Sequence, residues 1–449
     1  MKNACLSSGN CGGALKIGLA RIDITPDRPI RMAGYGARKA SSDRVRDRLH
    51  AKALLIENPD ASRALLITAD LIGFRRTFAD SLGEEIAAVL GMARSGILFN
   101  ASHTHAGPVF GAPPHVTEGF SPDERRAVED YTRTVREKLM QAALFAAGDL
   151  QPARLALGAG MSSLMVNRRE FAAEGIRIGF NPQGYVDRRV PVLRVERPDG
   201  GLRAVLFQCS CHNTALMSDN LGISSDYAGD AQRYVEESTP GVMALFMQGL
   251  GGTSVPWPRG TYDLCLRHGQ GLGMEACRVL SGAEFQPVLG PVRPALCEID
   301  LPLTPRPTPD QLDALRSGDE PDKGLAAQLD RKIASGALWP THLTTPVAFW
   351  RFGDTFDLIG LPGEVVAEFL PLIEHALGPR GLWLSAYCND YFGYLPTAQL
   401  HDQGGYESRD FITPTGFLAR TAESALIAGL RRIALHAGRP LPEWRRVFS

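Results

Sequence analysis

Two histidines separated by a single residue are the sharpest candidate for chemistry in this chain. They are His103 and His105, in the segment SHTHAGP at residues 102–108, directly after the apolar run GILFNAS. Residues i and i+2 of a strand point to the same side, so the two imidazoles can converge on one ion or substrate. Neutral imidazole is a common zinc ligand. Two partly exposed loop histidines remain the alternative interpretation.

Three further polar residues follow predicted strands. His212, in CSCHNTAL, is either a second metal ligand or a hydrogen-bonded core histidine. Asp226, in SSDYAGDA, is either a helix cap or the outer partner of a metal-bound histidine. Glu364, in LPGE, is either a hard metal ligand at the end of a strand or a glutamate in the first turn of a helix that faces solvent.

Tyrosines and one serine complete the set of candidates. Tyr387, Tyr391, Tyr394 and Tyr406 are core or rim aromatics, or else phenols that bind a metal or donate a proton. The glycine-rich run QGLGGTS at 248–254 lacks both the P-loop lysine and the dinucleotide spacing, which argues against a nucleotide cofactor. Ser254 in this run is a possible nucleophile or hydrogen-bond donor. The chain contains no GxSxG motif, which argues against a serine hydrolase of the α/β-hydrolase type.

Alternating strands and helices must position these residues. Apolar runs predict strands at 16–26, 51–59, 62–74, 96–102, 190–211, 355–364 and 382–396. Helices are expected at 78–92, opened by an Asp80 or Ser81 cap, at 123–147, from about Val365, and at 415–437. Residues 1–14 are predicted to be a flexible leader and 309–335 a polar helical insertion. We expect one α/β catalytic domain over 15–449, with mixed sheets flanked by helices.

Composition narrows the class of protein. The 449 residues include 48 Lys and Arg against 49 Asp and Glu, a net charge of −1, which argues against nucleic-acid binding. A hydrophobic content of 44% excludes a disordered chain. Cys209 and Cys211 are interpreted as buried thiols. Because neither a signal peptide nor a membrane-spanning run is apparent, we expect a cytoplasmic protein without an integral membrane segment.

Nine short segments, in this order along the chain, resemble the neutral ceramidase family, the zinc-dependent amidohydrolases that cleave the N-acyl bond of ceramide. The segments are RIDITP, MAGYG, SHTHAGP, VNRRE, CHNT, SSDYAGDA, LPGE, NDYFGY and QGGYE, and they span roughly residues 15–437. The resemblance implies a short form of the family, with the catalytic domain and without the C-terminal immunoglobulin-like domain. It also implies a role in sphingolipid or other lipid metabolism.

The resemblance assigns roles to individual positions. It implies one Zn²⁺ per chain held by His103, His212, Glu364 and Tyr394. It implies substrate or catalytic roles for six further residues: His105 at the amide and as proton shuttle, Arg168 near the head group, Tyr406 near the scissile carbonyl, Ser254, Gly34 and Tyr391. A water molecule activated by the metal would then attack the amide of a small N-acyl substrate.

The chain departs from the family pattern in one catalytic segment. Family members carry a GDVSPN-like stretch, where this chain reads GTSVPW at 252–257. Either Val255 or Ser254 falls at the serine position, and the acidic residue is missing. Ceramide or another N-acyl compound is therefore the expected substrate. A zinc esterase or lactonase, and a ligand-binding homologue without catalysis, are the alternatives. The oligomeric state stays open.

Overall fold

The computed structural model describes residues 15–112, 116–282, 284–317, 320–409 and 417–442, so the predicted leader at 1–14 lies outside the described residues. Three large sheets dominate the fold. The first has the order β5 (Ile97–Ala101), β4 (Arg63–Ala69), β3 (His50–Glu57), β1 (Lys16–Asp23) and β6 (Gln151–Pro152). The second has the order β13 (Met243–Gln248), β11 (Leu202–Cys209), β10 (Arg189–Glu196), β7 (Arg154–Met161) and β15 (Gln286–Pro287). The third has the order β16 (Val292–Pro302), β17 (His342–Phe352), β18 (Phe356–Gly360) and β20 (Leu382–Ser385).

Smaller sheets connect the site loops. They are β14 (Ser254–Pro256) with β8 (Met165–Ala172) and β9 (Gly175–Asn181), β12 (Gly222–Ile223) with β2 (Arg44–Val45), and β19 (Glu364–Val365) with β21 (Tyr394–Leu395). Parallel pairs (β4 with β5, β11 with β13, β18 with β20) occur beside antiparallel ones, so the sheets are mixed. The predicted α/β class with mixed sheets is confirmed.

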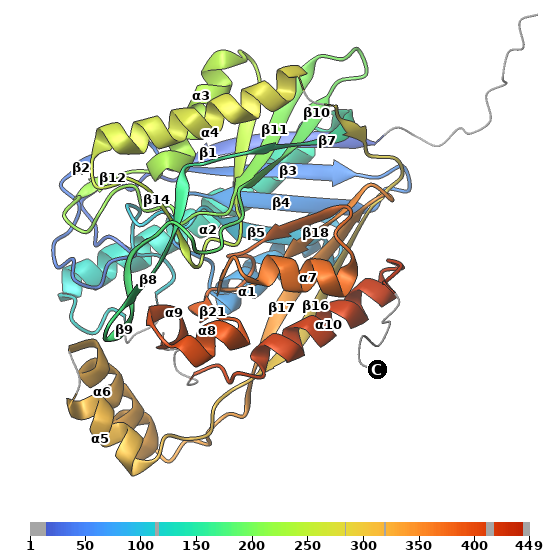
Figure 1. The fold of residues 1–449 in the computed structure, drawn as a ribbon. Coiled ribbons are helices and arrows are strands. Elements are labelled where there is room, and N and C mark those ends of the chain that lie inside the picture. The colour runs from blue at the N-terminus through green and yellow to red at the C-terminus, as the bar shows by residue number, and fades with distance from the viewer. Residues whose placement is uncertain (1–14, 113–115, 283, 318–319, 410–416, 443–449) are drawn as a thin grey trace, which may run out of the picture.

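Helices cover the outer faces of the sheets (Figure 1). Helices α1 (Arg76–Leu90) and α2 (Pro122–Gly148) cover the first sheet, α3 (Asp226–Ser238) and α4 (Tyr262–Gly282) the second, and α7 (Phe369–Leu377) and α10 (Ala422–His436) the third. Helices α5 (Pro309–Ser317) and α6 (Glu320–Ala334) pack together at one end of the molecule, and α8 (Ala398–Gln403) and α9 (Tyr406–Arg409) are short.

Strand residues alternate between two buried layers. Leu54 and Ile56 of β3 face a core shared by all three sheets, whereas Ala53 and Leu55 face the helices. Trp350 of β17 and Leu206 of β11 join the same shared core. Because both faces of these strands are buried, they read in the sequence as continuous apolar runs.

Two sequence predictions about helix starts are wrong. Helix α1 begins at Arg76, with Arg75 at its N-cap, so Asp80 and Ser81 lie inside the helix and do not cap it. The helix expected from about Val365 begins only at Phe369, because Glu364–Val365 forms β19. By contrast, the long helix expected at 123–147 is present and starts with a capping box between Ser121 and Glu124.

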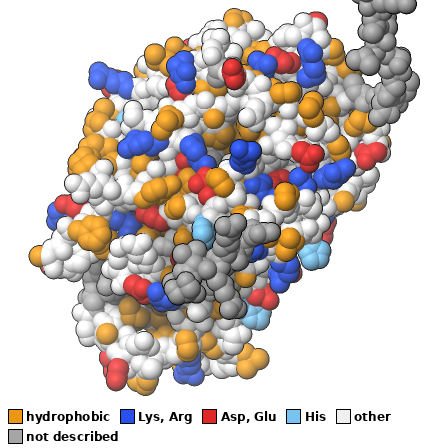
Figure 2. Space-filling view, turned by 45° about the vertical axis from the view of Figure 1, so that its right-hand side comes forward, with side chains coloured by type: hydrophobic (Ala, Val, Ile, Leu, Met, Phe, Trp, Pro, Cys, Tyr) orange, Lys and Arg blue, Asp and Glu red, His pale blue; other side chains and the backbone are white. Residues whose placement is uncertain are grey.

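The surface carries no large field of one sign on the face that Figure 2 shows, where Lys and Arg lie among Asp, Glu and hydrophobic side chains. This mixture agrees with the net charge of −1. Among the described residues, none of the helices combines the length and apolar character needed to cross a membrane.

Candidate metal centre

Strands of all three large sheets lead into one site. The HxH segment follows β5, His212 follows β11, Glu364 follows β18, and the tyrosines follow β20. Backbone pairing fixes these loops against each other: Asn100 forms a bridge with Cys388, and Ala386 N–H donates to the Gln248 carbonyl at 3.1 Å. The carboxyl ends of the strands therefore meet, as is common for sites in α/β proteins.

His103 and His105 converge for a different reason from the predicted one. Strand β5 ends at Ala101, and His103 has a left-handed backbone (φ 60°) held by its N–H bond to the Leu71 carbonyl. The two rings meet because the chain turns at His103, and not because alternate strand residues share a face. Left-handed backbone at a non-glycine residue is strained and concentrates at functional sites.

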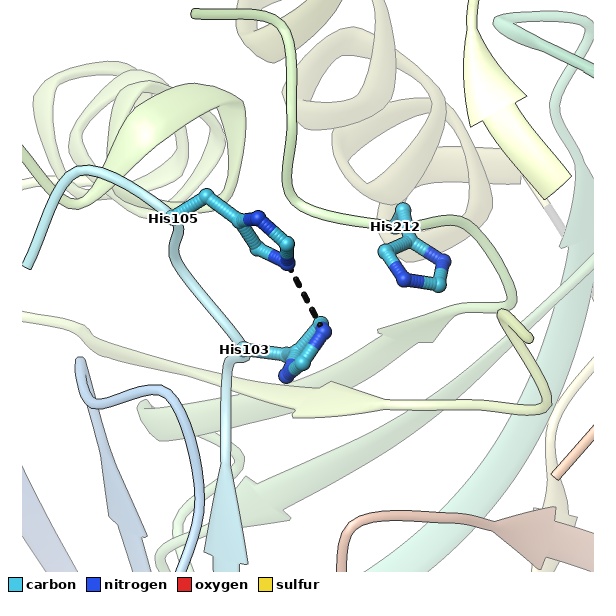
Figure 3. Close-up of side chains that lie close together, drawn as sticks. All are labelled: His103, His105 and His212. Carbon is cyan, nitrogen blue, oxygen red and sulfur yellow. Dashed lines mark hydrogen bonds between the residues drawn. The ribbon is translucent and has the colours of Figure 1, made fainter. Parts of the chain in front are cut away.

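Three imidazoles point toward one another (Figure 3). His105 Nε2 lies 2.9 Å from His103 Nε2, and the ring of His212 enters from a separate loop, 4.9 Å from the His103 ring. One ligand nitrogen from each of the three histidines lies within 4.8 Å of the others. His103 and His212 are fully buried, so the cluster is inside the protein.

Backbone carbonyls set the tautomers of two of these rings. His103 Nδ1 lies 2.7 Å from the Ile72 carbonyl oxygen, and His212 Nδ1 lies 2.6 Å from that of Gly251. A carbonyl oxygen only accepts, so each Nδ1 carries the hydrogen and each Nε2 keeps its lone pair. Both lone pairs then face the centre, as metal-binding histidines require.

A carboxylate and a phenol complete the cluster. Glu364 Oε2 lies 3.0 Å from His212 Nε2 and 3.3 Å from His103 Nε2, and Tyr394 Oη lies 3.1 Å from His212 Nε2. Glu364 and Tyr394 are register partners in the parallel pair β19–β21, which explains why residues 30 positions apart meet. Tyr391 donates its hydroxyl hydrogen to Glu364 Oε1 at 3.2 Å.

The donor set fits a divalent metal ion. Two imidazole lone pairs and a carboxylate oxygen face each other, and the buried Glu364 Oε2 has no hydrogen-bond partner among the described residues. Ligand atoms about 2.0–2.1 Å from a tetrahedral ion lie about 3.3 Å apart, close to these separations. Burial lowers the pKa of His212 to about 4, which favours the neutral, ligating form. Burial alone would raise the pKa of Glu364, but the neighbouring His103 and His212 hold it well below its usual value.

His105 has a position that the sequence did not distinguish. Its Nε2 faces His103, and its Nδ1 is buried without a hydrogen-bond partner in the part of the chain that the structure describes. Geometrically it is either a further ligand or a proton carrier beside the metal. Gly34 permits this placement: it has a φ of 93°, and a Cβ on it would lie 2.4 Å from the His105 ring.

Arg168 and Tyr406 lie beside the phenol ring of Tyr394. The Arg168 guanidinium is 5.2 Å from the centre of the Tyr394 ring and 5.7 Å from that of Tyr406. Arg168 Nε and Arg169 donate to the two oxygens of the buried Glu407, which the sequence analysis missed although it ends the QGGYE segment. The Tyr406 ring is half exposed and 5.4 Å from the Tyr394 ring, so it stands at the rim.

Ser254 lies directly behind His212. Its carbonyl accepts the His212 N–H at 2.9 Å, and its buried hydroxyl has no partner among the described residues. The acidic residue of the family segment is missing beside Gly252, where this chain has Thr253. A Cβ on Gly252 itself would lie 2.8 Å from the Glu364 carbonyl oxygen. Glycine at this position allows the two site loops to pack closely.

Asp226 stands at the start of α3, where its carboxylate accepts the N–H of Tyr227 at 2.7 Å, but it does not bond a histidine of the cluster among the described residues. It is the first residue of α3 and has a φ of 56°, and its carboxylate accepts the N–H groups of Ala215 and Leu216 at 3.0 and 2.9 Å. It therefore fixes the loop that follows His212, while the outer partners of the histidines are the carbonyls of Ile72 and Gly251.

The structure thus brings together His103, His105, His212, Glu364 and Tyr394, with Tyr391 and Gly34 in contact with them. Their roles as ligands and catalytic groups stay predictions. Tyr387 is an additional neighbour, with its ring 4.3 Å from that of His103 and its hydroxyl buried without a partner.

Comparisons with known proteins agree with this architecture. Residues 15–253 match the model of the neutral/alkaline non-lysosomal ceramidase N-terminal domain. Neutral ceramidases A and B of Dictyostelium discoideum are each 24% identical, over 51% and 52% of this chain and 33% of their own lengths. The matched region thus spans a third of these curated relatives.

Solved structures show the same fold across almost the whole chain. The neutral ceramidase of Pseudomonas aeruginosa superposes with a TM-score of 0.70 at 20% identity, covering 96% of this chain and 75% of that one. A structure described as ceramidase complexed with C2 gives 0.69 at 20% identity, covering 96% and 76%. The family match extends over more than half of the sequence, and the chain belongs to the neutral/alkaline non-lysosomal ceramidase family, a family of amide-bond hydrolases.

Proposed function

We propose that this protein is a zinc-dependent amidohydrolase that cleaves the N-acyl bond of a ceramide-like or other N-acylated small molecule. The observation that carries the proposal is the buried convergence of four ligand atoms: Nε2 of His103, Nε2 of His212, Oε2 of Glu364 and Oη of Tyr394. Two nitrogens and two oxygens in a closed interior site suit zinc better than magnesium or calcium, which prefer oxygen ligands alone.

The proposed metal and the surrounding residues have different roles in the reaction. A zinc ion, when bound, supplies a Lewis acid that activates water and polarises a carbonyl group. In the overall reaction the water oxygen bonds to the acyl carbon, the C–N bond breaks, and the amine nitrogen gains a proton. His105 is the side chain placed to move that proton, since it touches His103 and keeps a buried nitrogen without a partner.

Other residues hold and orient the reacting groups. The Ile72 and Gly251 carbonyls keep His103 and His212 in one tautomer and one orientation. Tyr391 steadies the Glu364 carboxylate through its hydroxyl. Arg168, charged and packed over the Tyr394 and Tyr406 rings, stands where it can orient the substrate beside the centre.

The test combines metal analysis with turnover by the purified full chain. We expect about one zinc per chain, with release of fatty acid from an N-acyl substrate, loss of activity on chelation, and recovery with zinc. Ceramide, a short N-acyl amine and the matching ester are compared. Turnover of the ester alone would indicate an esterase, and a protein with neither metal nor turnover would be a binding homologue. Either result would refute the proposal.

A further inference from the structure

A cavity of about 370 Å³ opens beside the metal centre. Three of its lining residues contact centre side chains: Gly34 lies against His105, the Ile72 carbonyl accepts from His103, and Tyr391 donates to Glu364. A group bound in this cavity is therefore next to the proposed reacting bond.

The cavity wall carries four cations. They are Arg31, Arg38, Lys39 and Arg75, and none of the described lining residues is acidic. The rest of the wall includes apolar side chains such as Phe110 and Phe120. A cationic wall with apolar patches is complementary to an amphiphile that carries a negative charge.

Most of the positive charge on the cavity wall is not paired with a carboxylate of the described residues. Arg38 is buried, and the acceptors of its hydrogen bonds are carbonyl oxygens of Ala33, His105, Met217 and Ser218. Within the described residues, the Lys39 ammonium donates to the Gly36 carbonyl and to no carboxylate. Arg31 meets Glu124 at a long 3.4 Å, which is the one carboxylate contact among the four in the described part of the chain.

Arg75 lies over a side chain that bonds the centre. Its guanidinium lies 5.3 Å from the centre of the Tyr391 ring, and Tyr391 in turn bonds Glu364. Arg75 is only partly buried. Its neighbour Arg76 pairs with Asp80 and Glu298, whereas no carboxylate of the described residues pairs with Arg75. A ligand anion can therefore reach it without displacing a protein partner.

Resting on the proposed amidohydrolase function, we propose that the substrate is an anionic N-acyl compound, with a carboxylate or similar group held by Arg75 and the neighbouring cations beside the scissile amide. A neutral lipid amide would leave this charge unmatched. Specificity of this kind follows from the cost of leaving a binding cation without its anion.

Matched substrates test the proposal on the zinc-loaded full chain. N-dodecanoylglycine and N-dodecanoylglycinamide differ only in the carboxylate. N-dodecylsuccinamic acid and N-dodecylsuccinamide form a second pair, with the charge on the acyl side and close to the scissile amide. We expect kcat/KM for one anionic amide to exceed that of its neutral partner by about tenfold or more. The preferred pair identifies which half of the substrate carries the anion.

Substitutions of single cations test whether the cavity causes the preference for anionic substrates. Arg75→Gln should reduce the anionic-to-neutral ratio about tenfold, mainly through KM, and Arg75→Lys should keep most of it. Arg432→Gln removes an exposed cation of α10 outside the cavity and should leave the ratio unchanged. Raising the ionic strength should weaken the preference.

The outcomes separate the two proposals. Equal turnover of both members of each pair would overturn the anionic specificity and leave the amidohydrolase intact. Equal turnover that rises only on vesicles containing anionic lipid would also overturn it and would assign the cations to a membrane surface. Failure of the zinc-loaded protein to hydrolyse any amide would overturn the proposed function and this inference together.

Discussion

The two parts of the chain on either side of residue 253 contribute unlike halves of the metal centre. Residues 15–253, which match the family model, supply the imidazoles of His103 and His212. Residues beyond 253 supply the carboxylate of Glu364 and the phenol of Tyr394. Neither part holds the complete set of proposed ligands, so the proposed chemistry depends on how the two parts pack.

Backbone hydrogen bonds join the two parts at the centre itself. Gly252 N–H donates to the Val365 carbonyl at 3.0 Å, and Phe99 N–H donates to the Asn389 side chain at 3.0 Å. Because these bonds run between the site loops, a shift of one part displaces ligands of the other. The centre is therefore a property of the packed domain and not of either sequence half.

Removing one ligand from each part gives the largest expected effect. His212→Ala and Glu364→Ala should each lower kcat/KM more than about 1,000-fold and bring bound metal well below one per chain, because each deletes a ligand atom at the centre. Metal content by mass spectrometry and turnover of an N-acyl substrate measure both losses.

A third variant serves as the control for this experiment. His342→Ala removes a half-exposed histidine of β17 and should leave metal and activity unchanged. If Glu364→Ala retained full metal and activity while His212→Ala lost both, the second part would not contribute a ligand.

The next largest effect concerns a buried ion pair between the parts. Glu407 pairs with both Arg168 and Arg169 of β8, and all three side chains are buried. Glu407→Gln leaves two buried guanidinium groups without a counter-charge, so the free energy of unfolding should fall by about 3–5 kcal/mol. Urea unfolding measures it. Glu170→Gln, which breaks the exposed pair with Arg177, should cost less than about 1 kcal/mol, and an equal loss in both variants would contradict the argument.

Residue types and strand ends predicted part of the site. His103, His105, His212 and Glu364 stand at or just after the ends of predicted strands, and strand ends in α/β folds meet at one edge. The choice of Tyr394 among the four tyrosines came from the resemblance to the family. The roles of the Ile72 and Gly251 carbonyls could not be predicted, because a backbone group carries no residue-type signal.

The misplaced helix starts have equally specific causes. At Val365, pairing with Leu395 through β19 and β21 replaced the expected helix, which is a long-range contact that local propensity does not encode. At Asp80, the carboxylate pairs with Arg76 and Arg94, so a residue typical of caps serves inside the helix.

A third prediction compares one buried acid from each part. Burial raises the pKa of Asp70 and of Asp390 to about 6, from 3.8. Between pH 4 and 6 the folded state therefore retains protons that the unfolded state releases, and the free energy of unfolding falls as pH rises through this window. Asp70→Asn and Asp390→Asn should each remove about 2 kcal/mol of that fall. Urea unfolding at pH 4 and pH 7 measures it, and identical pH dependence in parent and variants would contradict it.

The smallest expected effect concerns the metal affinity, and it tests whether the residues beyond 253 contribute to that affinity. Tyr391→Phe deletes the hydroxyl that bonds Glu364 Oε1 but keeps the ring that packs near His103. Outer partners of metal ligands contribute about tenfold to metal affinity, so the zinc Kd should rise about tenfold in a chelator competition. Tyr185→Phe, at a partly exposed tyrosine after β9, should leave the Kd unchanged. The deleted hydroxyl touches the carboxylate and neither histidine. An unchanged zinc Kd in Tyr391→Phe would therefore mean that the imidazoles of the first part dominate metal affinity. A tenfold rise in Kd would show that the second part orients its own ligand.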